Sequence, residues 1–136
     1  MDLGLRGKRL LSVSVEFAAR MQVSDTYFIT IESPFTLHVG GNAVALSPEE
    51  HPDNVLQALR QLIGYTIDEA TADEAGALHV VLGGGVRITV ESDPAYEAWN
   101  VSSSDGALVV SAPGGRLVSW KPQPNANRSA ESSPDQ

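Results

Sequence analysis

Apolar side chains recur at every second position along most of the first 120 residues, with polar side chains between them. This period of two is typical of strands that turn one face to a core and the other to water, as in antiparallel sheets. The alternation therefore predicts a chain that is mostly strand. The core-facing positions that it predicts are Val13, Val15, Phe17, Ile29, Ile31, Phe35, Leu37, Val39, Leu78, Val80, Leu82, Val86, Ile88, Val90, Leu108, Val110 and Leu117.

One stretch follows a helical period instead. Its apolar residues form a single stripe about 100° wide when they are placed on a helix. Pro52 and Asp53 are suited to a first helical turn, and Gly64 to the left-handed position just past a helix end. We therefore expect a short turn at 47–51 and a helix at about 52–63, with its apolar face against a sheet. The stripe consists of Val55, Leu56, Leu59, Leu62 and Ile63.

Two segments on either side of this helix resemble each other. Residues 5–10 carry a glycine between apolar residues, and Ile-Thr-Ile-Glu-Ser follows at 29–33. Residues 62–67 show the first pattern again, and Ile-Thr-Val-Glu-Ser follows at 88–92. These matches predict two similar three-stranded units, whose apolar faces cover each other with the helix between them. The alternative is a chance similarity between segments rich in β-branched residues.

The length of 136 residues fits a single domain. We expect the α+β class: an antiparallel sheet of about eight or nine strands, curved or in two layers, packed by the one helix. The two units span about residues 5–34 and 62–94, and a meander over residues 96–120 completes a domain that covers residues 1–120. Residues 121–136 carry no aromatic or large aliphatic side chain, so we expect a disordered tail.

The net charge of the chain favours some kinds of binding partner over others. The chain has 17 acidic residues against 9 Lys and Arg, a formal net charge of −8, and most of the acids lie between residues 49 and 105. Binding to a phosphate backbone depends on basic residues, so this composition disfavours nucleic acid. An acidic surface attracts a basic partner, unless the acids serve only to keep the domain soluble.

The chain also lacks the features of a membrane or exported protein. No stretch approaches the roughly 20 apolar residues of a membrane-spanning helix, and the alternating pattern near residue 13 is unlike a signal peptide. We therefore expect no membrane partner and a cytoplasmic location. An exposed strand edge permits pairing of two copies, so a monomer and a homodimer are both open.

Few residues point to catalysis or to metal binding. Cysteine is absent, which excludes disulfides and thiol nucleophiles. His38, His51 and His79 lack a metal-ligand spacing, and no Gly-x-Ser-x-Gly motif occurs. The glycine clusters join strand to strand, whereas a phosphate cradle opens a helix. We expect no catalytic residue, no metal and no cofactor, and hence no enzyme.

The scarce aromatic residues mark a candidate contact surface. Tyr96 and Trp99 lie beside Asp93 and Glu97, and Trp120 closes the last expected strand. Tyr and Trp dominate the energetics of protein interfaces, so these five residues are our partner-binding candidates. Tyr96 and Trp99 have opposite strand parity, and at most one of them faces the core of a regular strand. The alternative is that both tryptophans cover the open end of the core.

Two motifs in this part of the chain resemble those of a bacterial family. They are Asp-Pro-Ala-Tyr-Glu-Ala-Trp at 93–99 and Pro-Gly-Gly-Arg-Leu-Val-Ser-Trp at 113–120. In this order and spacing they resemble a family of small proteins, frequent in actinobacteria, that is classed as a domain of unknown function. The similarity covers most of residues 5–120, with a departure at Ser-Asp-Thr 24–26, where an Asp-Gly turn is expected. The resemblance implies a fold type and supplies no activity.

These observations favour a non-enzymatic domain that binds another protein, a basic one, through an acidic surface. Its mechanism would be steric and electrostatic blocking, by analogy with small acidic immunity proteins that neutralise toxins in bacterial competition. A second hypothesis is a small-ligand-binding domain, with a pocket of roughly 300 Å³ or more between the two units beneath the helix. A structural or homodimerising role is a further alternative.

Overall fold

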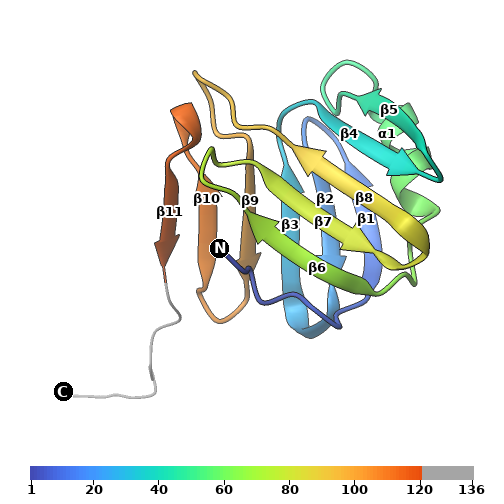
Figure 1. Cartoon of the computed structure of the whole chain (residues 1–136), viewed down its shortest axis with the longest axis horizontal. Coiled ribbons are helices and arrows are strands. Elements are labelled where there is room, and N and C mark those ends of the chain that lie inside the picture. Colours follow the sequence, from blue (N-terminus) through green and yellow to red (C-terminus); the bar gives the residue numbers. More distant parts are fainter. Residues whose placement is uncertain (121–136) are drawn as a thin grey trace.

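The structure is a computed structural model that describes residues 1–120, and Figure 1 shows its two facing sheets. One sheet has six strands in the order β1-β2-β3-β9-β10-β11, and the other has five in the order β5-β4-β8-β7-β6. The six-stranded sheet consists of β1 (Leu10–Val15), β2 (Ala19–Val23), β3 (Tyr27–Ile31), β9 (Trp99–Ser103), β10 (Leu108–Ser111) and β11 (Leu117–Trp120). The five-stranded sheet consists of β4 (Phe35–Val39), β5 (Asn42–Leu46), β6 (Ile67–Ala72), β7 (Leu78–Leu82) and β8 (Val86–Val90).

The predicted α+β class and the antiparallel pairing are confirmed, in the two-layered form. The sheets contain more strands than the about eight or nine that the alternation predicts. Strands β5 and β6 lack a regular alternation, each for a physical reason. Strand β5 is exposed at four of its five positions. Strand β6 has an irregular register between Ile67 and Glu69, which shifts its alternation by one residue.

The core lies between the sheets and follows most of the predicted alternation. The apolar positions of β3, β7 and β8 that the pattern selects are buried. Two positions differ. Phe17 lies in the turn after β1, whose last residue is Val15, and Val39 is exposed at the end of β4. The regular pattern therefore continues one step too far at both strand ends.

Strand β10 presents its residues with the opposite parity from the one predicted. Val109 is paired with buried Val101, so Val109 faces the core and its neighbours Leu108 and Val110 face outwards. Leu117 faces inwards as expected and packs against the core together with Val109. An unbroken run of apolar residues gives alternation no signal, and the register of the neighbouring strand decides the orientation.

Helix α1 (Pro52–Arg60) packs against β1 and β2. It ends earlier than the predicted residue 63, because the amide of Leu62 bonds to the carbonyl oxygen of Leu59 and tightens the last turn. Gly64 then adopts a left-handed φ of 96° and donates its amide hydrogen to the carbonyl oxygen of Leu10. Leu62 is buried as predicted, whereas Ile63 is exposed.

Three sets of three successive strands have the same arrangement. In β1-β2-β3, β6-β7-β8 and β9-β10-β11, a three-residue turn joins the second strand to the third: Ser24–Thr26, Gly83–Gly85 and Pro113–Gly115. The first two triplets lie within the residue ranges of the two predicted units, 5–34 and 62–94, and belong to opposite sheets. The third extends the six-stranded sheet, and β10 and β11 lie beside the five-stranded sheet, at the left in Figure 1.

A contact at the backbone of Gly76 joins the two sheets. The carbonyl oxygen of Gly76, in the turn between β6 and β7, accepts hydrogen bonds from Trp99 Nε1 and Ser111 Oγ, each at 2.9 Å. The backbones of Gly76 and Gly115 meet there so closely that a Cβ on Gly76 would lie 2.3 Å from the carbonyl oxygen of Gly115. The close approach therefore requires glycine at both positions.

Two sequence predictions concern the limits of the chain. The disorder predicted for residues 121–136 lies outside the described residues. Within residues 1–120, no helix is long and apolar enough to cross a membrane.

Candidate binding cleft

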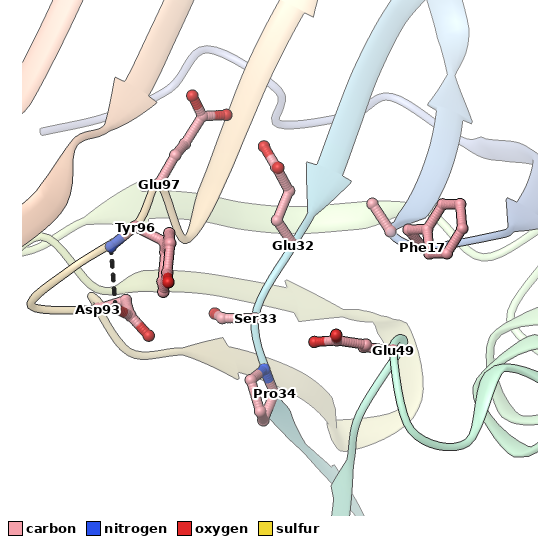
Figure 2. Close-up of a pocket in the computed structure, with 9 residues that line it drawn as sticks. Phe17, Glu32, Ser33, Pro34, Glu49, Asp93, Tyr96 and Glu97 are labelled. Carbon is pink, nitrogen blue, oxygen red and sulfur yellow. Dashed lines mark hydrogen bonds between the residues drawn. The ribbon is translucent and has the colours of Figure 1, made fainter.

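A cavity of about 540 Å³ opens at the end of the sandwich where the chain passes between the sheets. Figure 2 shows the segments that line it: the β1–β2 turn with Phe17, the crossing from β3 to β4 at 32–34, and the crossing from β8 to β9 with Asp93, Tyr96 and Glu97. Glu49, from the segment before α1, lines a further wall. We call this cavity the acidic cleft.

The two crossings hold each other in place. The amide of Glu32 donates to the carbonyl oxygen of Ala98 at 2.9 Å, and the buried Ser33 Oγ donates to the same oxygen at 3.4 Å. Both crossings contain a proline, Pro34 in one and Pro94 in the other, and proline cannot continue a sheet ladder. The sequence thus ends each strand where the chain must leave its sheet.

Asp93 shapes the loop that presents Tyr96. Asp93 Oδ1 accepts hydrogen bonds from the amides of Ala95 at 2.8 Å and Tyr96 at 3.0 Å, and Figure 2 marks the second. The Asp93 carbonyl oxygen accepts a hydrogen bond from the amide of Gly114 at 2.8 Å. An aspartate that bonds to backbone amides two and three residues ahead stabilises a tight turn without further side chains. The loop therefore holds Tyr96 at the rim of the cleft.

Four carboxyl groups surround the cleft, and no Lys or Arg is among the described residues that line it. A side-chain hydrogen bond to Glu97, burial and repulsion from Glu97 raise the pKa of Glu32 to about 7. Glu97 Oε2 in turn accepts a hydrogen bond from Asn100 Nδ2 at 2.8 Å. Near neutral pH, Glu32 is thus balanced between its protonated and charged forms. The four acids are Glu32, Glu49, Asp93 and Glu97.

Two exposed aromatic rings flank these acids. Phe17 is 85% exposed and Tyr96 is 74% exposed, on opposite sides of the cleft in Figure 2. Large apolar rings usually bury much of their surface, so two bare rings at one cavity are typical of a contact site. Aromatic faces and carboxylates both attract organic cations. The arrangement is suited to an ammonium or guanidinium group.

The structure brings together three of the five residues that the sequence selected. Asp93, Tyr96 and Glu97 all line the acidic cleft. Trp99 does not belong to a contact surface, because its side chain is fully buried and its indole N–H is bonded to Gly76. Trp120 is 54% exposed but lies at the end of β11 and does not line the cleft. Tyr96 lies in the crossing before β9, so strand parity does not apply to it, and of the two residues only Trp99 faces the core.

Sequence reasoning missed Phe17, Glu32 and Glu49. The alternation of β1 predicts Phe17 in the core, whereas Phe17 lies exposed in the turn after this strand. Glu32 had a usable signal, since it is part of the repeated Ile-Thr-x-Glu-Ser pattern that ends in each crossing. Glu49 comes from a segment far from the others in sequence, and only the tertiary fold brings it to the cleft.

The position of this cavity differs from that of the predicted ligand pocket. The prediction placed a pocket between the units and beneath the helix, but no residue of α1 lines the acidic cleft. The helix packs against β1 and β2 with Val55 and Leu59 buried, and a separate cavity of about 390 Å³ is lined by Gln57, Arg60 and Gln61. Crossing segments, rather than the helix, enclose the acidic cleft.

The histidines lie outside the cleft. His79 Nε2 is 2.9 Å from Asp73 Oδ2, in the β6–β7 region, and this bond together with the amides of Ala77 and Ala75 lowers the pKa of Asp73. No group of three or more His, Asp or Glu side chains within residues 1–120 is arranged to hold a metal ion. Asp73 and His79 thus stabilise the β6–β7 turn.

Comparison with known proteins places the chain in one family. The model of a family of unknown function, DUF6188, matches residues 1–121. This match confirms the resemblance to a family classed as a domain of unknown function. No curated protein and no solved structure matches the chain.

Proposed function

The chain belongs to the DUF6188 family of unknown function, and we propose that it is a non-enzymatic domain that binds a basic segment of another protein in the acidic cleft. A Lys or Arg side chain of the partner would enter between Phe17 and Tyr96 and meet the carboxyl groups behind them. The effect on the partner would be steric and electrostatic blocking, as in a small acidic inhibitor.

The observation that carries this proposal is the convergence of four acids and two bare aromatic rings on one cavity. Partly desolvated cation–π contacts contribute about 0.5–2 kcal/mol each, and carboxylates add charge-assisted hydrogen bonds. The net charge of −8 adds long-range attraction for a basic partner and raises the association rate at low salt. We keep the cytoplasm as the proposed location, since a chain without cysteine needs no oxidising compartment.

A small organic cation is the second candidate ligand. The cavity volume of about 540 Å³ lies within the range of roughly 300–1,000 Å³ that is usual for small-molecule sites. The same carboxyl groups and rings would contact such a ligand. The two candidates differ in how much of the acidic surface outside the cleft contributes to binding.

Calorimetric titration of the full chain tests the proposal. The probes are an arginine-rich peptide, a neutral peptide of equal length and free L-arginine. We expect the arginine-rich peptide to bind more tightly than the neutral one, with an affinity that falls as salt rises. The double variant Glu49→Gln, Glu97→Gln should weaken binding severalfold, since each partly exposed charge pair contributes up to ~1 kcal/mol and Glu32, no longer facing Glu97, regains part of the lost charge.

A matched control separates the cleft from general charge. The double variant Glu69→Gln, Glu74→Gln removes the same two charges from residues that do not line the cleft, and it should retain the affinity. Equal losses in both double variants, or no binding of the arginine-rich peptide at low salt, would refute the proposal. Binding of free L-arginine as tight as that of the peptide would favour the small-ligand alternative.

A further inference from the structure

The outer face of the six-stranded sheet changes character between β9 and β10. Residues that pair across antiparallel strands lie on the same face, so the register defines this face strand by strand. On β1, β2 and β9 the outward residues are Ser12, Ser14, Arg20, Gln22, Asn100 and Ser102. On β10 and β11 they are Leu108, Val110, Val118 and Trp120. We call these last four residues the apolar patch.

The apolar patch is partly exposed, and most of the rest of the face is polar or shielded. Trp120 is 54% exposed, and Leu108, Val110 and Val118 are half-buried. By contrast, the one aromatic ring elsewhere on this face, Phe28 on β3, lies under the Arg20 guanidinium at 4.3 Å. The core does not account for the patch, because Val109 and Leu117 are the residues of these strands that pack against it.

Charge distinguishes the patch from the acidic cleft. None of its four residues is charged, whereas the chain as a whole carries a formal net charge of −8. A basic partner is attracted to the acids and gains nothing electrostatic at this patch. Two copies of an acidic protein repel each other at most orientations, and the repulsion is lowest where uncharged surfaces meet. A second copy therefore meets little electrostatic repulsion at the patch.

The chain beyond β11 does not supply a cover of matching chemistry. Residues 121–136 follow Trp120 directly and contain no aromatic or large aliphatic side chain. Apolar burial requires apolar groups on both sides of a contact. A second copy brings the same four side chains, and a two-fold axis makes the surface complementary to itself.

We propose that two copies of this protein pair face to face through β10 and β11, with the apolar patches at the centre of the interface. The pairing is reversible and weak, because two short strands fall below the roughly 800 Å² per partner of a stable interface. Asn100 and Ser102, next to the patch on β9, form its polar rim. This inference does not depend on the ligand proposed for the acidic cleft. The cleft lies elsewhere, at the end of the sandwich.

Sedimentation velocity of the full chain over a series of protein concentrations tests this pairing. We expect the sedimentation coefficient to rise with concentration toward that of a dimer. Val118→Glu should raise the dimer dissociation constant at least about tenfold, because dimerisation would bury two unpaired carboxylates near each other. Val118→Thr, which keeps the β-branched shape, should weaken the dimer less and guards against misfolding of the Glu variant.

The control places the same charge elsewhere on the same face. Ser14→Glu lies at the opposite edge of the sheet, and its dimer should match that of the unmodified chain. Circular dichroism verifies that each variant is folded. A monomer at every concentration, or a dimer that both Val118 variants leave unchanged, would overturn the inference.

Discussion

Glu32 shows how a single side chain acquires its properties from the fold. Its backbone amide is bonded to Ala98 on the other crossing, and its carboxyl group faces Glu97. The ordinary pKa of 4.5 rises to about 7 because the proton on Glu32 satisfies a hydrogen bond between two acids and removes their repulsion. The folded chain therefore retains a proton that the unfolded chain releases.

This proton makes stability depend on pH. The contribution of Glu32 is fully present below pH 4.5 and is lost as the pH rises through about 7, so the free energy of unfolding should fall across this window. The carboxyl group is partly exposed, and solvent screening limits the effect to the order of 1 kcal/mol. Urea denaturation at about pH 5 and about pH 8 measures it.

Two variants isolate the contribution of Glu32 to that pH dependence. Glu32→Gln keeps a neutral hydrogen-bonding group at all pH values, so its unfolding free energy should change less between the two conditions. Glu91→Gln alters the matching position of the second repeat unit, which does not line the cleft, and should behave like the unmodified chain. Identical pH profiles for Glu32→Gln and the unmodified chain would contradict the assigned role.

Among the elements, the three-residue turns differ in whether their residues readily adopt the positive φ angles that the turns require. Gly84 and Gly85, like Gly114 and Gly115, have positive φ angles in the second and third turn. In the first turn the same positions are Asp25 and Thr26, with φ of 66° and 58°. A β-branched residue in this region is strained, whereas glycine is not. The residues at 24–26 therefore differ in type from those of the other two turns, whereas the backbone conformation is the same.

Thr26→Gly should stabilise the protein. Relief of the left-handed strain, of about 1–2 kcal/mol, outweighs the greater freedom of glycine in the unfolded chain, for a net gain of about 0.5–1 kcal/mol. Thermal unfolding measures this gain as a higher midpoint. Thr26 Oγ1 also lies 2.7 Å from Ser104 Oγ, so Ser104→Ala serves as a control that removes this bond alone. A lower midpoint for Thr26→Gly than for Ser104→Ala would contradict the strain interpretation.

The sequence predicts a strand well where one face of the strand is buried and the other is exposed to solvent. Strands β3, β7 and β8 have this pattern and were located with their inward residues. Strand β5 buries almost nothing, and β10 is apolar at consecutive positions, so periodicity could not identify the first or orient the second. Both depend on the neighbouring strand to which they bond, which is tertiary information.

The same limit applies to the acidic cleft. Asp93, Tyr96 and Glu97 were recognised together because they are neighbours in sequence. The repeated Ile-Thr-x-Glu-Ser pattern marks Glu32, but no local pattern shows that Glu32 and Glu49 join them where the chain crosses between the sheets. Site residues that are adjacent in sequence can thus be predicted together, whereas residues from distant segments can be assigned only once the fold is known.

At the scale of the whole molecule, the backbone contact between Gly76 and Gly115 joins the sheets. It brings the β6–β7 turn of one sheet against the β10–β11 turn of the other, and Trp99 and Ser111 bond to the same carbonyl oxygen. A side chain at either glycine would separate the turns and weaken both hydrogen bonds. The third triplet is thereby fixed to the second.

Gly76→Ala tests this contact. The new Cβ would lie 2.3 Å from the Gly115 carbonyl oxygen, and we expect a loss of about 1–3 kcal/mol from the clash in addition to the strain of a left-handed alanine. Gly106→Ala is the matched control, since its φ is 99° and no atom lies within 4 Å of the added Cβ. Urea denaturation compares the two variants, and equal destabilisation would show that the sheets do not need this approach.

The crossings at 32–34 and 91–98 have a consequence for how this protein could change. They supply most of the walls of the acidic cleft, and the hydrogen bonds from Glu32 to Ala98 and from Ala98 to Ser111 that join them to the sheet are made by backbone atoms. Side chains such as Glu32, Tyr96 and Glu97 are therefore free to vary in charge and size while the framework persists, much as variable loops do on an antibody scaffold. Members of one fold could in this way acquire different ligands, and a laboratory library confined to these few positions would sample that diversity directly.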